Sequence, residues 1–198
     1  KYGVDSLRYY LIKEVSFGND GNISEEKLEN CINSDLANNF GNLCQRVISF
    51  NEKNINLKIP QSFKFNNEDL EILNNYKKNF DNLIDFIDNQ KINEYVNFIQ
   101  DQLFAANKYF NDQEPWKKKD DQERLNTIVY VSLELIRKIS ILLYPIIPAT
   151  ILKVLDIFQI KEGDIEFNSI KNDLILKSVS KIKKISILFK KIEKNDWF

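Results

Sequence analysis

Apolar residues recur at every third or fourth position over residues 32–47 of the sequence. This spacing places side chains along one side of a helix, and such an apolar stripe has to be buried against other elements. Ser24, followed by Glu25 and Glu26, provides an N-cap and first-turn acids. We therefore predict a long amphipathic helix from about Ser24 to about Glu52. Its stripe consists of Ile32, Leu36, Phe40, Leu43 and Val47.

Three polar residues of the same helix, Asn38, Asn42 and Arg46, are spaced four apart. Residues at this spacing form a row on the helix surface, and hydrogen-bonding side chains in a row are suited to reading base edges. Asparagine is abundant throughout the chain, so a solvated helix surface is the open alternative. Gly41 interrupts the pattern at a cost of about 1 kcal/mol relative to alanine. A glycine there suggests a close approach by another backbone or by a ligand.

Helical periodicity continues along most of the chain. Turn residues over 17–23 predict a chain reversal, residues 54–65 read as an extended connector, and Asn66 or Asn67 is expected to cap the next helix. Amphipathic helices with short connections predict an all-α helix bundle. The helix over 122–143 has the highest apolar density and is expected at its centre. The predicted helices cover about residues 2–15, 24–52, 67–88, 93–110, 122–143 and 150–158.

The helical pattern ends near Gly163, where short apolar runs begin to alternate with lysines. We expect a short irregular C-terminal tail, and the simplest interpretation of its basic cluster is a solvated surface. The predicted organisation is a first segment over 1–23, a bundle over 24–160 and the tail over 161–198. The basic cluster consists of Lys181, Lys183, Lys184, Lys190 and Lys191.

Composition excludes several classes of site. A net charge of −1 provides no general attraction to nucleic acid, so any RNA contact must be local. The chain has no histidine and no CxxC pair, so neither a zinc site nor a Ser-His or Cys-His nucleophile is expected. Cys31 and Cys44 are too far apart along one helix to pair, and buried free thiols in a reducing compartment are expected.

The chain contains neither a membrane-spanning apolar run nor a signal peptide, and a soluble cytoplasmic protein is expected. Because the sequence begins at Lys1 within a helical pattern and contains no Met, we expect it to be part of a longer protein.

Trp116 follows Pro115 at the end of the fourth predicted helix, and three lysines follow it. A tryptophan in this position either plugs the core or forms an exposed stacking platform. Aromatic residues mostly serve burial, which favours the plug. The adjacent lysines and the amide row favour RNA, because unpaired bases stack on aromatic faces for about 1–3 kcal/mol each.

Three stretches together resemble the C-terminal half of methionyl-tRNA synthetases, a family of class I aminoacyl-tRNA synthetases. They are KYGVDSLRYYLIKEVSFGNDGNIS at the start, NSDLANNFGNLCQR on the long helix, and NKYFNDQEPW with the later LLYPIIPAT. The terminal LFKKIE also resembles the end of that family's core. The resemblance covers nearly the whole chain, and the PW ending is typical of the methionyl branch.

The resemblance implies an anticodon-binding bundle that follows a catalytic domain absent from this sequence. The full enzyme would activate methionine with ATP and Mg²⁺ and transfer it from methionyl-adenylate to tRNA(Met). The catalytic signatures and any zinc knuckle would lie upstream, so this chain alone is expected to have no catalytic residues, no metal and no cofactor. Residues 1–23 would link the two parts and support the tRNA, and the tail would pack back towards the catalytic domain, leaving apolar residues among 182–188 exposed.

The resemblance also implies the anticodon-binding residues. A base of the CAU anticodon would stack on Trp116, and Arg46, which closes the LANxxGNLxxR pattern, would contact a base or a phosphate. Asn42, Asn38 and Asn33 would add hydrogen bonds to base edges. Some family members carry an arginine close to the position of Asn38, which weakens the assignment of Asn33 and Asn38. Two alternatives stay open: the bundle of another class I synthetase, and a protein-interaction bundle without an RNA role.

Overall fold

The computed structural model describes residues 2–14 and 23–193. In these two ranges the chain forms a bundle of helices, and extended pairing is limited to an isolated antiparallel bridge between Lys58 and Lys181. The predicted all-α bundle is confirmed. The reversal predicted over 17–23 lies, apart from Ile23, outside the described residues. Among the described helices, none is long and apolar enough to cross a membrane.

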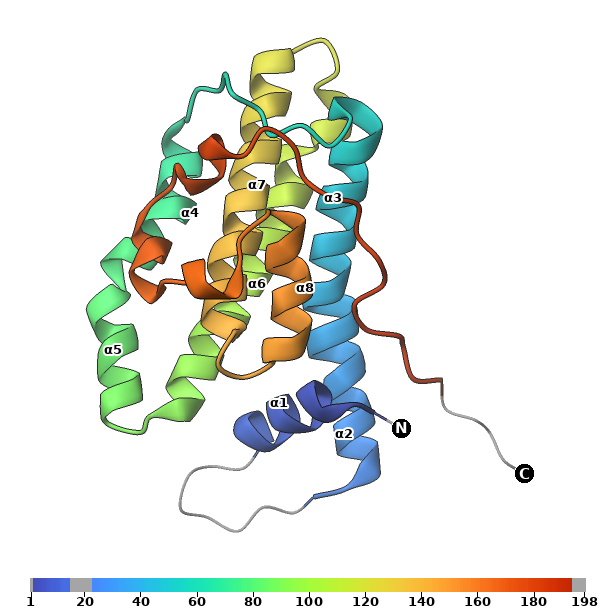
Figure 1. The fold of residues 1–198 in the computed structure, drawn as a ribbon, viewed down its shortest axis with the longest axis vertical. Coiled ribbons are helices and arrows are strands. Elements are labelled where there is room, and N and C mark those ends of the chain that lie inside the picture. Colours follow the sequence, from blue (N-terminus) through green and yellow to red (C-terminus); the bar gives the residue numbers. More distant parts are fainter. Residues whose placement is uncertain (1, 15–22, 194–198) are drawn as a thin grey trace.

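One long helix runs along the side of the bundle and carries the predicted stripe (Figure 1). All five stripe residues are at most 3% exposed. Ser24 caps the helix, because its Oγ accepts a hydrogen bond from the backbone N–H of Lys27 (3.2 Å). The helix ends at Ile55, nearly one turn beyond the predicted Glu52. Its parts are α2 (Glu25–Cys31), the π-helical segment η1 (Ile32–Gly41) and α3 (Asn42–Ile55).

The π-helical segment is the main departure from the regular helix that the sequence predicts. The backbone N–H of Asn42 bonds to the carbonyl of Ala37, five residues earlier. A Cβ added to Gly41 would lie 3.0 Å from the carbonyl oxygen of Leu36 and 3.7 Å from the side chain of Phe189. The nearest backbone at Gly41 therefore belongs to the wide turn of its own helix, and not to another element as predicted; the approach from outside the helix is the side chain of Phe189.

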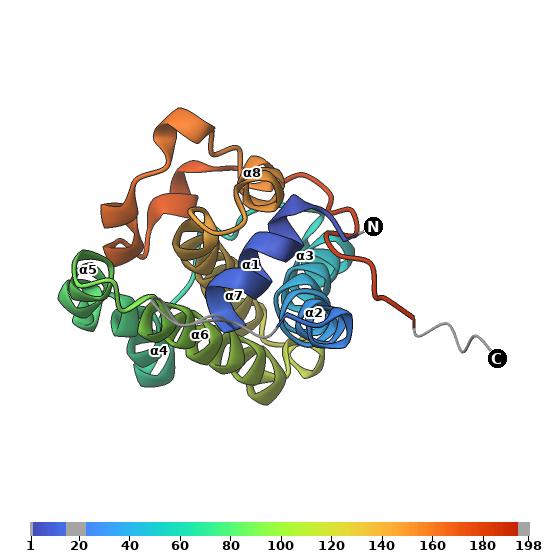
Figure 2. The same cartoon turned by 90° about the horizontal axis from the view of Figure 1, so that it is seen from below.

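The first helix, α1 (Val4–Glu14), lies across one end of the bundle (Figures 1 and 2). The guanidinium of Arg8 donates to the carbonyls of Ile146 and Pro145, each at 2.8 Å. The carboxylate of Asp5 accepts a hydrogen bond from the backbone N–H of Thr150 (2.6 Å). These bonds fix α1 to the turn that precedes α8 (Pro148–Ile157).

The helix predicted over 67–88 is wrong as a single element, because it breaks at Asn79 into α4 (Asn67–Lys78) and α5 (Phe80–Asp88). The side-chain amide and the backbone N–H of Asn79 both donate to the carbonyl of Asn75 (2.9 and 3.1 Å), a local side-chain bond typical of helix ends. The predicted cap is confirmed at Asn66, whose side chain forms a capping box with Asp69.

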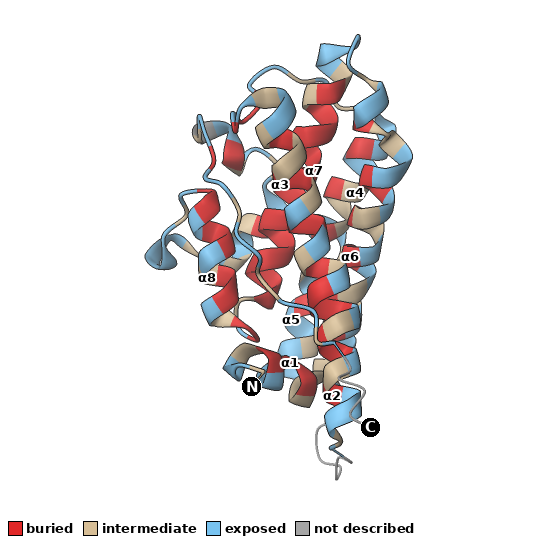
Figure 3. Ribbon diagram, turned by 90° about the vertical axis from the view of Figure 1, so that its right-hand side faces the viewer, coloured by how far each residue is buried: buried red, intermediate tan, exposed pale blue. Residues whose placement is uncertain are grey.

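The two longest helices, α6 (Ile92–Gln113) and α7 (Gln122–Leu143), pack against each other. Buried residues cover nearly all of α7, which confirms its central place (Figure 3). On α6, the predicted inward set is buried except for Phe104, which is 69% exposed. The prediction for Phe104 was wrong because its position in the 3.6-residue repeat lies well away from the buried stripe centred near Ile99 and Leu103.

A buried ion group on α7 holds the first part of the tail. Arg137 and Glu134 are fully buried and joined at 2.6 Å. The guanidinium of Arg137 also donates to the carbonyls of Ser169 (3.1 Å) and Asn172 (2.8 Å). Short 3₁₀ turns occupy this part of the tail: η3 (Glu162–Asp164), η4 (Phe167–Lys171) and η5 (Ile175–Ser178).

The rest of the tail runs along the bundle in an extended conformation, beside α3 (Figure 1). The backbone N–H of Ile182 donates to the carbonyl of Leu57 (2.7 Å), within the connector between α3 and α4. Ile182 is buried, whereas Ile187 is 71% exposed, so the exposure expected for the tail's apolar residues applies to only some of them.

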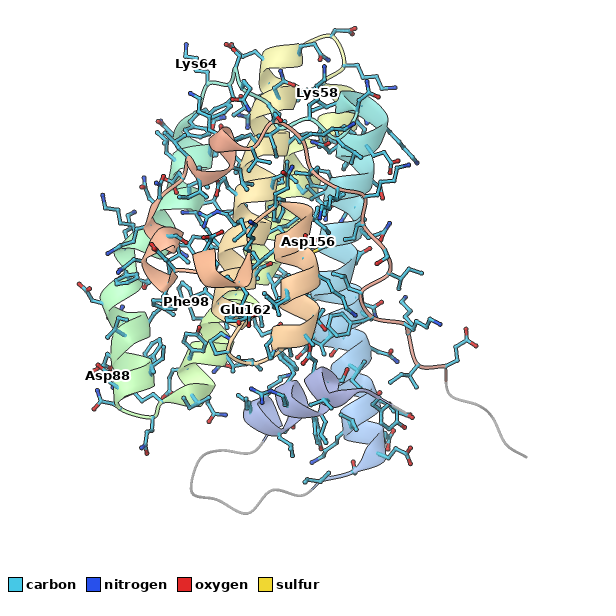
Figure 4. All side chains as sticks on the ribbon, viewed as in Figure 1. Lys58, Lys64, Asp88, Phe98, Asp156 and Glu162 are labelled. Atoms are coloured by element: carbon cyan, nitrogen blue, oxygen red, sulfur yellow. The ribbon has the colours of Figure 1, made fainter. Side chains whose placement is uncertain are left out.

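Two lysines of the tail's basic cluster form ion pairs with helices of the bundle. Lys183 pairs with Asp156 of α8, which Figure 4 labels, at 2.6 Å. Lys184 pairs with Glu52 of α3 at 2.5 Å.

Cys31 and Cys44 are buried free thiols, as predicted.

Candidate nucleic-acid interface

The turn that carries Trp116 joins α6 to α7 at the end of the bundle far from α1 (Figure 1). Glu114 ends α6 in the left-handed conformation (φ 44°), and Pro115 then begins the 3₁₀ turn η2 (Pro115–Lys117). Proline suits this first position because its fixed φ is already helical. The turn presents the indole of Trp116 at the surface with 41% of the residue exposed. Trp116 is therefore only partly buried and does not plug the core.

Arg46 and Trp116 meet at the ring of Phe110. The indole of Trp116 makes an edge contact with this ring, with centroids 6.1 Å apart and planes at 69°. The guanidinium carbon of Arg46 lies 5.4 Å from the same centroid, in cation–π geometry. Arg46 Nη2 also donates to the side chain of Asn111. These contacts hold the guanidinium of Arg46 and the partly exposed indole of Trp116 against the same ring.

A buried carboxylate fixes the two helix ends that flank this turn. Asp69 is fully buried and accepts hydrogen bonds from both terminal nitrogens of Arg124 (2.5 and 3.1 Å) and from the hydroxyl of Tyr109 (2.5 Å). Arg124 in turn donates to the side chain of Gln113, the last residue of α6. Burial, with the neighbouring Asp69, raises the pKa of the Tyr109 hydroxyl. The end of α6, the start of α7 and the start of α4 are thus joined around one carboxylate.

The asparagines of the long helix divide into two groups. Asn38 and Asn42 are exposed, and both line a groove of about 200 Å³ between η1, α3 and the tail. Asn33 is instead committed to the tail: its Nδ2 donates to the carbonyl of Ile192 (2.9 Å), and its Oδ1 accepts from the N–H of Ile192 (2.8 Å). Both polar atoms of the Asn33 side chain are therefore used by the tail, and Asn33 does not line the groove with Asn38 and Asn42.

Sequence reasoning missed the residues that position Arg46 and Trp116. Phe110 and Asn111 lie on α6 and hold the guanidinium of Arg46 from a different helix. Their role depends on how α3 and α6 pack, which no local pattern reports. The capping box of Asn66 and Asp69 could have been predicted from the sequence, but the ion pair between Asp69 and Arg124 could not.

Charges near the turn are partly neutralised. Lys117 pairs with Glu114 at 2.7 Å, and its side chain is largely exposed. Lys118 and Lys119 form no ion pair within residues 2–14 and 23–193. The same ranges contain no group of three or more His, Cys, Asp or Glu residues that could hold a metal ion. The surface offers an indole, a guanidinium, amides and lysines, a set suited to splayed-out bases and phosphates.

Comparison with known families shows the class of protein to which the chain belongs. Residues 59–197 match the family described as the anticodon binding domain of methionyl tRNA ligase. The chain belongs to the methionyl-tRNA ligase family. Residues 1–48 match a second family, described as class I tRNA synthetases (M). Membership in the methionyl family decides against the bundle of another class I synthetase.

Similar curated proteins are methionine–tRNA ligases. That of *Brucella suis* is 38% identical over 84% of this chain, and that of *Thermotoga maritima* is 34% identical over all of it. The chain spans about a third of the length of these relatives, 33% and 32%.

Solved structures of *Mycobacterium tuberculosis* methionyl-tRNA synthetase have the same fold. The free form covers 98% of this chain with a TM-score of 0.88 at 30% identity, and this chain covers 40% of that protein. A form bound by methionyl-adenylate covers 96% of this chain with a TM-score of 0.86 at 31% identity. This chain covers 38% of that structure.

Proposed function

We propose that this chain recognises the CAU anticodon of tRNA(Met) within a methionine–tRNA ligase. The observation that carries this proposal is the contact of Arg46 and Trp116 with one ring, that of Phe110. An unstacked base placed on the indole of Trp116 would lie next to the guanidinium of Arg46. A base-sized aromatic surface beside a planar donor is a common arrangement for reading single-stranded RNA.

The row formed by Asn38 and Asn42 extends this site along the helix. An asparagine amide offers both donors and an acceptor, which match the mixed edges of nucleobases. Asn33, which the resemblance also implied, is left out of the proposed reading row because the tail uses both of its polar atoms.

The whole enzyme would form methionyl-adenylate from methionine and ATP and then transfer the methionyl group to the 3′ end of tRNA(Met). ATP and Mg²⁺ would be bound by a catalytic domain next to α1, since residues 1–48 match the synthetase family. Contacts at the anticodon would help to hold the distant acceptor end in that domain, so this chain would contribute through positioning. Such an enzyme would act in the cytoplasm.

The test is a binding titration of an anticodon stem-loop with CAU against one with a changed first anticodon base, at two salt concentrations. The proposal requires selective binding of CAU that Trp116→Ala weakens. Equal and steeply salt-dependent binding of the two RNAs would indicate phosphate contacts alone and would reject anticodon reading.

A further inference from the structure

We propose that the C-terminal tail builds the second wall of a nucleotide-binding groove that continues the anticodon site along the long helix. The groove would take a single-stranded nucleotide next to the anticodon on the same RNA. This inference rests on the proposed function, and it adds residues of the tail to the RNA surface.

The groove has one polar wall and one largely apolar wall. The polar wall comes from η1 and α3 and presents the side-chain amides of Asn38, Asn42 and Gln45. The opposite wall is the tail, with the side chains of Ile187, Leu188, Phe189 and Lys191. The groove between the two walls has a volume of about 200 Å³. Figures 1 and 3 show this part of the tail running beside the long helix.

Three polar side chains of the groove are available for a ligand, whereas the amide of Gln45 donates to the hydroxyl of Ser49 (3.0 Å). Among the described residues, the side chains of Asn38, Asn42 and Lys191 form no hydrogen bond or ion pair. By contrast, Lys183 and Lys184 of the same tail are paired with carboxylates. Unused amide donors and acceptors facing an aromatic side chain suit a base, and an unpaired lysine at the rim suits a phosphate.

Gly41 lies at the floor of the groove, where it has no side chain to fill the space. A Cβ at this position would stand 3.7 Å from the ring of Phe189 and 3.0 Å from the carbonyl of Leu36, so a larger side chain would fill the space between the walls. The wide π-helical turn brings that carbonyl close and leaves the amides of Asn38 and Asn42 on the groove side. The glycine and the π-helical turn therefore both shape the site.

The tail wall is held in place by Asn33, through its two hydrogen bonds to the backbone of Ile192. This gives Asn33 a positioning role: it would fix the wall that faces Asn38 and Asn42 without touching RNA.

The groove is also continuous with the anticodon site. Asn42 is one turn from Arg46 and Asn38 is two turns away, roughly 6 and 12 Å along the helix axis. At about 3.4 Å per stacked nucleotide, this span corresponds to roughly two to four steps along a strand. A strand whose base stacks on Trp116 can therefore reach the groove with the nucleotides that flank the anticodon.

The experiment measures binding of a CAU stem-loop to the full 198-residue chain and to variants of the groove. Lys191→Gln should weaken binding and lower the slope of log K against log salt by about 0.7–0.9, the change for one lost phosphate contact. Lys77→Gln is the matched control, because Lys77 is an exposed lysine of α4, outside the groove. It should leave the salt slope unchanged.

Two further variants separate RNA contact from folding. Asn38→Ala should lower affinity about 5- to 100-fold if the amide reads a base, and an abasic nucleotide beside the anticodon should then cause no further loss. Ile187→Asp places a carboxylate at a residue that is 71% exposed, so it should weaken RNA binding without changing the melting temperature.

The outcomes distinguish this inference from the proposed function. If Trp116→Ala abolishes CAU selectivity while Lys191→Gln and Ile187→Asp both bind like wild type, the tail is not a wall of a nucleotide site, and the anticodon assignment of Trp116 stands. If wild type shows no CAU selectivity, the proposed function fails and this inference fails with it.

Discussion

Asp69 and Arg124 form a bidentate ion pair in which the carboxylate is fully buried and the guanidinium largely so. The pair joins the first turn of α4 to the first turn of α7, and Arg124 extends it to Gln113 at the end of α6. The end of α6 and the start of α7 carry the Trp116 turn. The geometry of the proposed RNA surface therefore depends on an interaction that never contacts RNA.

Asp69→Ala is expected to destabilise the protein by about 3–5 kcal/mol, because it leaves the Arg124 charge partly buried without its partner. Urea denaturation followed by circular dichroism measures the change. Asp85→Ala is the control, since Asp85 pairs with Lys91 between exposed side chains and should lose much less stability. Equal losses for the two variants would contradict the role given to the buried pair.

Trp116→Ala is expected to weaken binding of a CAU stem-loop by about 1–3 kcal/mol, the value of one lost base stack. Because Trp116 is 41% exposed, the variant should keep its fold, which a thermal melt would check. Phe104→Ala removes another exposed aromatic ring, on α6, and provides the control. Unchanged affinity of the Trp116 variant would reject the stacking role.

The fold was largely predictable because its helices are specified by local chemistry. The apolar stripe of the long helix and the caps at Ser24 and Asn66 follow from spacing and side-chain hydrogen bonding alone. The break at Asn79 was missed because several asparagines in this segment could form the same side-chain bond, and the sequence does not show which of them does. The π-helical turn was missed because the spacing of four between Ile32, Leu36 and Phe40 fits both kinds of helix.

The candidate site was predictable only in part. The PW-KKK pattern drew attention to Trp116, yet its exposure depends on how the α6–α7 turn packs on Phe110. The role of Asn33 is set by a contact with Ile192 at the other end of the chain, and no local pattern reports such contacts. The residues proposed to read RNA, Asn38 and Asn42, and the residue that holds the tail, Asn33, are all asparagines on one helix, so only the packing separates them.

Arg46→Lys tests whether this residue reads a base. Lysine keeps the charge but lacks the planar fork of donors, so a base contact should be lost at a cost of about 1–3 kcal/mol for CAU. The affinity for a stem-loop with a changed anticodon should fall less than the affinity for CAU. The measurement is the ratio of the dissociation constants of the two stem-loops, compared between the variant and wild type. A loss that is the same for both RNAs would place Arg46 on a phosphate.

The two thiols should be protected in the folded protein. Burial, followed by the nearby carboxylate of Asp35, raises the pKa of Cys31 to about 12, and burial raises the pKa of Cys44 further. At pH 8 both should react with a thiol reagent slowly in the native protein and rapidly in denaturant. Cys31→Ser and Cys44→Ala variants assign the two reactions. Fast native labelling of either thiol would contradict the buried arrangement.

The raised pKa of Cys31 also predicts that the folded protein loses stability at alkaline pH. Because the folded state favours the neutral thiol of Cys31, this contribution to stability is fully present below the unfolded pKa near 9 and is lost as pH rises towards 12. Burial also raises the pKa of the Tyr76 and Tyr95 hydroxyls, which adds to the loss above pH 10. Urea midpoints measured between pH 8 and pH 11 should fall, and a Cys31→Ser variant should fall less steeply over pH 9–10.

Arg137 on α7 provides the test of how the tail is held. Its guanidinium is fully buried, pairs with Glu134 and donates to two carbonyls of the tail, so Arg137→Ala leaves the buried carboxylate of Glu134 without its ion partner and removes both tail hydrogen bonds. We expect a loss of about 3–5 kcal/mol. Hydrogen exchange should rise most in the backbone N–H groups of residues 167–178, because two of the hydrogen bonds that fix this part of the tail to α7 are lost. A Lys183→Ala variant, which removes a pair between exposed side chains, should cost at most about 1 kcal/mol. If Arg137→Ala changed exchange no more in the tail than in α4, the buried ion group would not be what holds the tail on the bundle.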